Sequence, residues 1–179
     1  MTGSPSGERA TRPVETEYPS FYGNYVRKVG DGDIVRSMRE QVRETTGFLR
    51  GIPESRAGHR YEPGKWSIRE VVGHVCDSER VFSYRAVRIA RGDTTPLPGF
   101  DEKDFVARSS LDKRSLDSLV DELEAIRGST VALFDSLFPE EWSRRGTASG
   151  REITVRALAW VIAGHERHHM EVLRTRYLG

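Results

Sequence analysis

Four long stretches of this 179-residue chain repeat apolar residues with the spacing of an α-helix, and this periodicity constrains the fold more than any other feature. We expect helices over about 34–50, 68–91, 115–137 and 154–179. The sequence predicts no pair of strands, no internal repeat and no second domain. Because four helices of this length in one chain pack as a four-helix bundle, the predicted fold class is all-α.

Capping signals support the helix boundaries. Asp33 is a plausible N-cap for the first helix, and the stretch "GIPESRAG" at 51–58 ends that helix. Ser67 and Glu70 have the spacing of a capping box, in which each side chain satisfies a free backbone N–H of the other. The second helix is therefore expected to begin after Ser67 and to end at Gly92.

Two segments outside the four helices have distinct compositions. Residues 1–17 are rich in Ser, Gly, Thr and charge, which predicts a disordered arm before a single domain over 18–179. The stretch "DTTPLPGFDEKDFVARSS" at 93–110 has two prolines and is expected to contain a short helical turn. It predicts a long loop between the second and third helices, and long loops often cover or shape a site.

Composition excludes several classes of partner. The chain has 28 basic and 27 acidic residues and a net charge of +1, whereas nucleic-acid binding needs clustered basic residues. No apolar run approaches the ~20 residues that cross a bilayer, and the first residues lack the apolar core of a signal peptide. The single cysteine, Cys76, cannot form an internal disulfide. We therefore expect a cytoplasmic protein without a membrane or nucleic-acid partner.

Three of the five histidines lie in "AGHERHHMEVL", residues 163–173. His165 and His169 fall one turn apart in the middle of the apolar face of the fourth helix, and His168 points toward its flank. Because i and i+4 side chains have Cβ atoms ~5–6 Å apart, both imidazoles can bind one metal ion. The alternative is a pair of core histidines bonded to backbone or water, at the cost of burying polar groups.

His74 is a third candidate ligand, at the edge of the buried face of the second helix. Metal sites in helix bundles are built from side chains that point inward from facing helices. Together with His165 and His169, His74 would give three nitrogen ligands and open coordination positions, as in catalytic metal sites. The alternative for His74 alone is a polar residue at the edge of a helix face.

Three carboxylates lie near these histidines by helical position: Glu79, Glu166 and Asp77. Each is a candidate base or a partner of a metal ligand. The favoured alternative is an ordinary solvated or salt-bridged carboxylate. Glu79 is the most unusual of the three, because it falls well inside the apolar face of the second helix, where an unpaired carboxylate is costly.

Several other residues are assigned to structure rather than chemistry. Trp66 precedes the N-cap of the second helix and is expected to pack on the core rather than contact a substrate. Cys76 is expected to be a small core residue, because i and i+2 side chains such as His74 and Cys76 do not face each other on a helix. His59 has no partner pattern and is expected to be exposed.

The stretches "PGKWSIREVVGHVCDSERVF" at 63–82 and "VRALAWVIAGHERHHMEVL" at 155–173 resemble the DinB-like superfamily of four-helix metalloproteins. More closely, they are similar to the branch that contains the bacillithiol transferases, and "TTPLPGFDEKDF" and "RGTASGREITVRALAW" also match that branch. The resemblance covers nearly the whole chain from about Tyr18. It implies His74, His165 and His169 as ligands of a divalent ion, zinc or nickel, with water completing the shell. It also implies a homodimer.

The same resemblance implies transfer of a low-molecular-weight thiol, such as bacillithiol, to an electrophile in detoxification. An open metal position would hold the thiol as the nucleophilic thiolate. Arg80, Arg85 and Arg88 could serve an anionic thiol, although arginines on a helix flank are ordinarily solvated. A metal-dependent hydrolase and a non-enzymatic metal-binding bundle remain as alternatives. No Ser-His-Asp spacing, phosphate loop or dinucleotide-binding fingerprint indicates another class.

Overall fold

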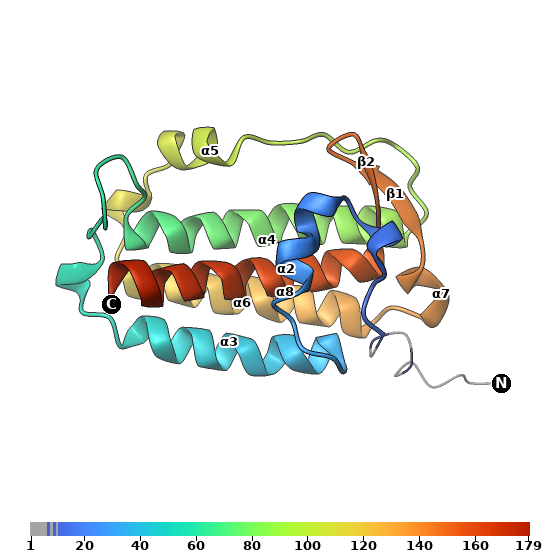
Figure 1. Ribbon diagram of the computed structural model, residues 1–179, viewed down its shortest axis with the longest axis horizontal. Coiled ribbons are helices and arrows are strands. Elements are labelled where there is room, and N and C mark those ends of the chain that lie inside the picture. The colour runs from blue at the N-terminus through green and yellow to red at the C-terminus, as the bar shows by residue number, and fades with distance from the viewer. Residues whose placement is uncertain (1–6, 8, 10) are drawn as a thin grey trace.

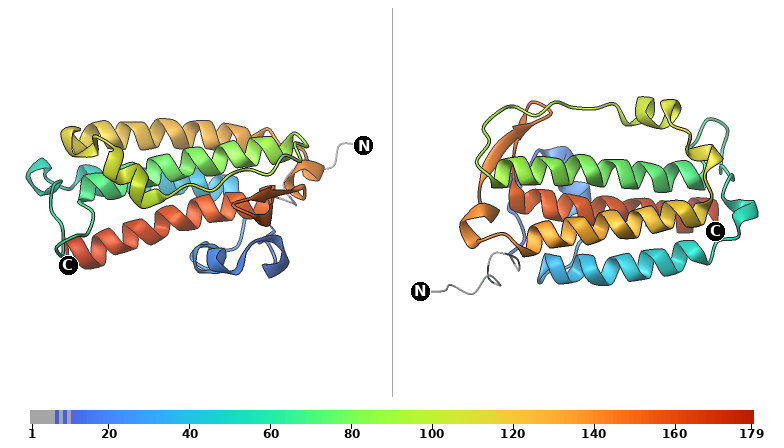
Figure 2. Two further views of the ribbon diagram at one scale, coloured as in Figure 1. Left: turned by 90° about the horizontal axis from the view of Figure 1, so that it is seen from above. Right: turned by 180° about the vertical axis from the view of Figure 1, so that it is seen from behind.

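Four long helices lie side by side and form a bundle in the computed structural model, which describes residues 7, 9 and 11–179 (Figures 1 and 2). They are α3 (Ile34–Arg50), α4 (Ile68–Ala90), α6 (Leu116–Asp135) and α8 (Val155–Val172). Both α6 and α8 pack against α3 and α4. The predicted all-α bundle is therefore confirmed. No described helix combines the length and the apolar character that crossing a membrane requires.

The helices begin where the capping residues predict. Asp33 Oδ1 accepts hydrogen bonds from the backbone N–H groups of Val35 and Arg36, at 2.9 and 3.1 Å. At the start of α4, the Ser67 N–H donates to Glu70 Oε2 at 2.6 Å and the Glu70 N–H donates to Ser67 Oγ at 3.3 Å, so the capping box is confirmed. The α8 helix continues past its C-terminal end as one π-helical segment, Leu173–Tyr177.

Short elements complete the fold. The helices are α2 (Gly23–Val26), α5 (Glu102–Arg108) and α7 (Pro139–Trp142), with 3-10 turns at Glu15–Glu17, Ser20–Tyr22, Glu54–Arg56 and Leu111–Lys113. The predicted long loop between α4 and α6 contains α5, and it runs back along α4 on one side of the bundle (Figure 1). The α2 segment packs against α8. The short helices α2 and α5 therefore lie against α8 and α4, the helices that contain the candidate metal-binding histidines.

The expectation that the chain has no strand pair is wrong. Strands β1 (Arg145–Ala148) and β2 (Arg151–Thr154) form an antiparallel hairpin just before α8. Ser149 and Gly150 make its two-residue turn, both at positive φ, 53° and 73°. Strands of four residues are too short to show a clear alternation of polar and apolar residues. The hairpin is also held by tertiary contacts, including a bridge between Leu97 and Ala148.

The predicted disordered arm, residues 1–17, is only partly described, because residues 1–6, 8 and 10 lie outside the described part of the chain. Its last residues differ from the expectation. Glu17 is buried, its Oε1 accepts from Thr154 Oγ1 at 3.0 Å, and Arg156 donates to the same oxygen at 3.0 Å. Arg12 donates to the carbonyl oxygens of Val26 and Val29. Residues 12–17 therefore pack on the bundle because charged groups anchor them.

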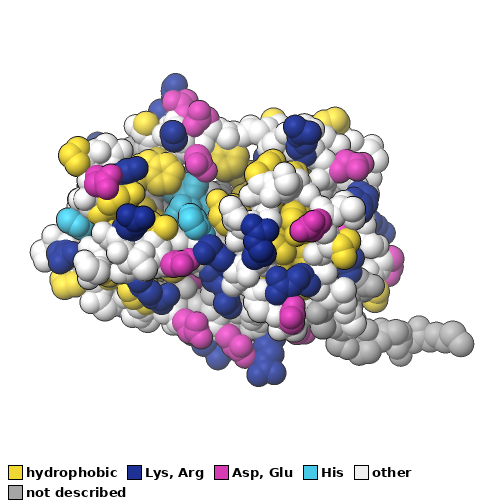
Figure 3. Space-filling view, viewed as in Figure 1, with side chains coloured by type: hydrophobic (Ala, Val, Ile, Leu, Met, Phe, Trp, Pro, Cys, Tyr) yellow, Lys and Arg dark blue, Asp and Glu magenta, His cyan; other side chains and the backbone are white. Residues whose placement is uncertain are grey.

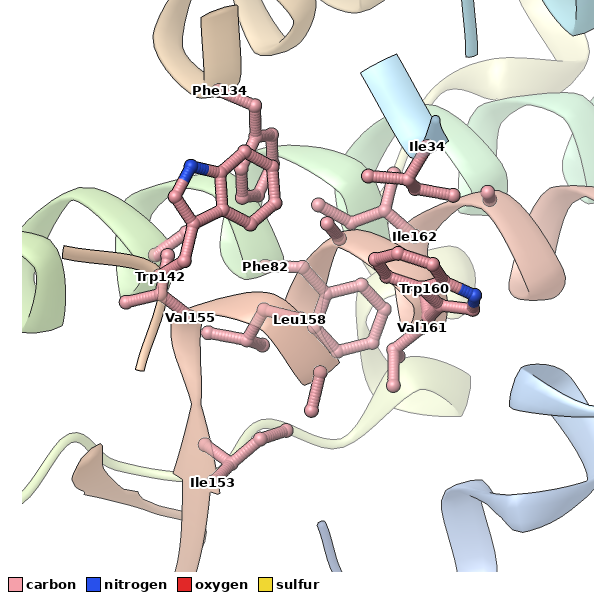
Figure 4. Packing of buried hydrophobic residues seen from close by; sticks show 14 of the residues in the cluster. Ile34, Phe82, Phe134, Trp142, Ile153, Val155, Leu158, Trp160, Val161 and Ile162 are labelled. Atoms are coloured by element: carbon pink, nitrogen blue, oxygen red, sulfur yellow. The ribbon is translucent and has the colours of Figure 1, made fainter. Parts of the chain in front are cut away.

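The core of the bundle consists of two apolar clusters with a polar layer between them. The first cluster surrounds Trp142, Trp160 and Phe134 and is drawn in Figure 4. The second surrounds Leu119, Leu123 and the C-terminal part of α8. Along each long helix, buried polar residues stand between the two clusters: Gln41 and Thr45 on α3, Ser78 and Glu79 on α4, Arg127 and Thr130 on α6, and His165 and Glu166 on α8. Such a layer is costly unless its groups are paired or bind a ligand.

Candidate metal centre

Three histidines from two helices point their Nε2 atoms at one another. His74 Nε2 lies 3.1 Å from His165 Nε2, and His169 Nε2 lies 3.2 Å from His165 Nε2. The three ligand atoms all lie within 4.8 Å of one another. Two Zn–N bonds of ~2.0–2.1 Å at a tetrahedral or octahedral angle place their nitrogens about 3 Å apart. The two separations from His165 and the ligand type therefore suit a single metal ion held by the three side chains.

The environment keeps these imidazoles neutral. Burial lowers the pKa of His74 to about 4. Burial, and next the neighbouring imidazoles, lower the pKa of His165 and of His169 well below the usual value of 6.5. A neutral imidazole offers a lone pair to a metal, whereas an imidazolium does not. The site is thus in the protonation state that metal binding requires.

Aromatic and polar neighbours fix the orientation of the rings. Ser78 Oγ lies 3.4 Å from His74 Nδ1, the nitrogen that faces away from the other histidines. The Trp66 ring packs on His74, with ring centroids 4.8 Å apart. Tyr25 from α2 and Phe82 from α4 both meet the His165 ring edge-on, at 5.2 and 5.8 Å. Packing thereby pre-orients the nitrogen atoms of the site.

Residues of the histidine cluster line two separate cavities. The first has a volume of about 600 Å³ and is lined by His165, Phe82, Tyr25, Arg85 and Glu102, among others. The second has about 570 Å³ and is lined by His168, His169, Trp66, Val172 and Tyr177, among others. Lys103 lines both. On the face of the molecule that Figure 3 shows, histidine side chains (cyan) lie at the bottom of a hollow. The cluster is therefore open to ligands, unlike a closed structural metal site.

Glu79 and Glu166 do not contact the histidines as bases; both are bound by Arg127. The Arg127 Nε and Nη2 donate to the two oxygens of Glu79, each at 2.8 Å, and Nη2 also donates to Glu166. All three side chains are almost completely buried. The salt-bridged interpretation of these carboxylates therefore holds. The triad leaves one unit of formal negative charge in the polar layer, which favours a cation there.

The carboxylate nearest to the histidines is a different one. Glu102, the first residue of α5, places Oε2 4.0 Å from His74 Nε2, and its side chain is 55% exposed. Asp77, the third candidate from the sequence, is directed to Arg80, with Oδ1 3.4 Å from Nη1. Glu102 lies in the long loop, so helical spacing relative to the histidines does not identify it.

Four further residues that the sequence assigned to structure or to the surface lie in or near the core, the surface and the histidine cluster. Cys76 is buried, its Sγ lies 3.8 Å from the Leu119 carbonyl oxygen, and burial raises its pKa, so the core assignment is confirmed. His59 is exposed, as expected. His168 is partly buried at the edge of the cluster, 5.1 Å from His169 between ring centroids. Trp66 packs on His74 and also lines the second cavity.

The three arginines of α4 have different environments. Arg80 is exposed and binds Glu122, and Arg88 binds Asp93 near the surface. Arg85 is buried and lines the first cavity. The expectation that such arginines are solvated therefore fails for Arg85 alone among the three.

Two important residues were not found from the sequence. Arg127 stands four residues after Leu123 and seven after Val120, so the apolar period of α6 signals an arginine on the buried face. Tyr25 belongs to an aromatic segment without clear period, and only the packing of α2 on α8 brings it to His165.

A family model for the DinB superfamily matches residues 37–173, which include the three histidines and most of the bundle. The chain belongs to the DinB superfamily. A curated protein of Oceanobacillus iheyensis, named as a putative metal-dependent hydrolase, is 28% identical over 112 residues. This match covers 62% of the present chain and 64% of the length of the Oceanobacillus protein.

Solved structures share the fold at low sequence identity. YfiT from Bacillus subtilis, described as a probable metal-dependent hydrolase with an unusual four-helix bundle topology, matches with a TM-score of 0.68 and 18% identity, over 92% of both chains. A mycothiol-dependent maleylpyruvate isomerase matches with a TM-score of 0.64 and 15% sequence identity. This match covers 76% of the present chain and 58% of the isomerase. The DinB-like protein YjoA from Bacillus subtilis matches with a TM-score of 0.57 and 21% sequence identity. This match covers 81% of the present chain and 90% of YjoA. These similarities establish the bundle fold.

Proposed function

We propose that this DinB-superfamily protein is a metal-dependent S-transferase that joins a low-molecular-weight thiol to an electrophile, as in detoxification. The observation that carries the proposal is the pair of cavities on the histidine cluster. His165 lines one cavity and His169 lines the other, and these two ligands are one helical turn apart. Two substrates can therefore approach the same metal position from two sides, as a transfer reaction requires.

The residues of the site have distinct roles in this reaction. His74, His165 and His169 would hold one divalent ion, zinc or nickel, which favours the deprotonated, nucleophilic form of a thiol. Glu102 is placed to accept the thiol proton, because its carboxylate lies beside His74. The sulfur then forms a bond to carbon of the electrophile, whose leaving group departs with its electron pair. Trp66 and Phe82 hold the histidines in place.

Similarity to known proteins supports a thiol as one substrate. The isomerase that shares the bundle is named as mycothiol-dependent. The sequence resembles the branch of the superfamily that contains the bacillithiol transferases. We propose a low-molecular-weight thiol of this kind, bacillithiol or a related compound, as the cosubstrate. The homodimer and the cytoplasmic location that we expect from the sequence stay predictions.

A hydrolase on the same site is the second candidate. One similar protein is named as a putative and another as a probable metal-dependent hydrolase, and Glu102 is the described carboxylate close enough to serve as a base for water. Glu79 and Glu166 are engaged by Arg127 and do not supply that base. The hydrolase needs one substrate cavity, whereas the protein has two on the cluster.

One assay distinguishes the S-transferase from the hydrolase. Zinc- or nickel-loaded protein is incubated with chlorodinitrobenzene and a panel of thiols that includes bacillithiol and mycothiol, and separately with nitrophenyl acetate without thiol. We expect thioether formation that requires both metal and thiol, disappears in His165→Ala and persists in His59→Ala. Ester cleavage without thiol, and no thioether with any thiol, would establish the hydrolase instead.

A further inference from the structure

Arg85 is a buried cation in the wall of the first cavity. It is 2% exposed, and its Nη2 donates to the Pro98 carbonyl oxygen at 2.8 Å and to Ser149 Oγ at 2.9 Å. Both acceptors are neutral, and so is the Tyr22 hydroxyl, which also interacts with the Arg85 side chain. Within the described residues, no carboxylate lies within salt-bridge distance of its guanidinium. A buried charge without a counterion is costly, so this position calls for an anionic ligand.

Comparison with the other arginines shows that this arrangement is unusual for the chain. Arg127, the other fully buried arginine among the described residues, is bound by the carboxylates of Glu79 and Glu166. Arg88, less than one turn further along α4, lies near the surface and still binds Asp93. Arg85 is therefore buried in a cavity wall and has no acidic partner in the part of the chain that the structure describes.

The structure around Arg85 is built to hold the guanidinium in place. The rings of Phe82 and Phe100 each lie 5.9 Å from its Cζ atom. Ser149, which accepts its hydrogen bond, sits in the hairpin turn with a φ of 53°, a conformation that non-glycine residues rarely adopt. The Ser149 N–H is bound in turn by the Leu97 carbonyl oxygen. Two loops thus meet at Arg85 and fix one of its nitrogens.

The cavity connects Arg85 to the metal ligands. The Phe82 ring lies between them, 5.9 Å from the Arg85 Cζ and 5.8 Å from the His165 ring. The acidic residues of the cavity have other contacts: Glu102 is beside His74, and Asp101 caps α5 by accepting from the Lys103 and Asp104 N–H groups. The Arg85 guanidinium and the His165 imidazole thus belong to the lining of one cavity, and each is next to the Phe82 ring.

We propose that Arg85 binds the carboxylate group of the thiol substrate, while the thiol of the same molecule reaches the three histidines. This inference rests on the proposed function, because it assigns the first cavity to the thiol. The second cavity, lined by Trp66, Val172 and Tyr177, then takes the electrophile. A single guanidinium suits a carboxylate, which carries one charge, better than a phosphate dianion, which Asp101 and Glu102 would repel.

Three matched probes test this assignment on the zinc-loaded full chain. Mercaptohexanoate has both a thiol and a carboxylate, its methyl ester lacks the charge, and hexanoate lacks the thiol. Dissociation constants are measured by NMR titration. We expect the wild-type protein to bind mercaptohexanoate at least tenfold more tightly than the ester, and to bind hexanoate more tightly than inorganic phosphate. Equal affinity for the acid and the ester, or tighter binding of phosphate, would overturn the proposal.

Variants show which residue the preference for the acid over the ester depends on. Arg85→Met should reduce the preference for the acid over the ester to less than about twofold, whereas Arg88→Met, on the same helix, should leave it unchanged. Ser149→Ala removes an acceptor of Arg85 but keeps the cation, so the preference should persist. If Arg85→Met does not fold, Lys103→Met, an exposed change at the same cavity, should weaken acid binding by about two- to threefold. A preference that survives in a folded Arg85→Met protein would refute the assignment.

The probes also separate this inference from the proposed function. Hexanoate binding that depends on Arg85, without any zinc-dependent binding of the two thiols, supports the carboxylate site and contradicts thiol transfer. Zinc-dependent binding of both thiols with equal affinity supports the thiol site and overturns the role of Arg85.

Discussion

The backbone of Tyr25 touches the backbone of Gly164 so closely that no side chain fits between them. A Cβ atom on Gly164 would lie 2.0 Å from the Tyr25 carbonyl oxygen. This contact lets α2 pack directly on α8, one residue before the candidate metal ligand His165. It also places the Tyr25 ring edge-on against the His165 imidazole, with ring centroids 5.2 Å apart. A glycine outside the metal site therefore determines one wall of it.

Gly164→Ala should destabilise the protein by about 1–3 kcal/mol or more, because the added methyl group must push α2 away from α8. Urea unfolding measures the change. Gly128→Ala is the matched control, since this glycine is in the interior of α6, is exposed and has no atom within 4 Å of its Cβ position. That substitution should stabilise the helix by roughly 0.5–1 kcal/mol. Equal stability of Gly164→Ala and wild type would contradict the close contact.

Arg127→Met should destabilise the protein by about 3–5 kcal/mol, because it leaves Glu79 and Glu166 buried without a counterion. Arg80→Met removes an exposed ion pair with Glu122 and should cost less than about 1 kcal/mol. The free energies of unfolding in urea check both values. A loss below 1 kcal/mol for Arg127→Met would mean that the triad is not a buried, charged unit.

Metal content should depend on three of the five histidines. Protein purified without a histidine tag or chelator should contain near-stoichiometric zinc or nickel by mass spectrometry, and alanine at His74, His165 or His169 should remove it. His59→Ala should retain it. Because two apolar clusters flank the site, the metal-free protein should keep its helical circular dichroism. Unfolding on chelation would instead indicate a structural metal.

The stability of the metal-free protein should fall as the pH is lowered from about 6.5 to about 4. In the unfolded chain the three histidines take up protons near 6.5, whereas in the folded chain the pKa of His74 is about 4 and those of His165 and His169 are well below 6.5. The unfolded state therefore binds more protons in this window, which favours unfolding. Urea midpoints at pH 7 and pH 5 measure the effect.

The triple change His74→Leu, His165→Leu, His169→Leu is the control for this pH dependence. It removes the three groups and should flatten the change of the urea midpoint between the two pH values. A triple variant whose midpoint changes with pH as much as that of the wild type would show that the histidines do not carry the effect.

Local sequence signals were enough for the long helices and for the histidine cluster. Asp33, Ser67 and Glu70 mark helix starts because capping involves neighbouring residues only. His165 and His169 are identified as a pair because an i, i+4 spacing on an apolar face brings two side chains together in any α-helix. The place of His74 beside them required only that α4 and α8 face each other, which a four-helix bundle makes natural.

Only the tertiary structure decided what surrounds these histidines. The hairpin at 145–154 forms because Ser149 and Leu97 meet, although its strands are too short to be recognised alone. Glu79 is paired with Arg127, and Arg85 lacks a carboxylate partner among the described residues, although all three are charged residues on long helices. Periodicity tells which side of a helix is buried, but the partner of a buried charge lies on another segment of the chain. That partner is set by how the segments pack.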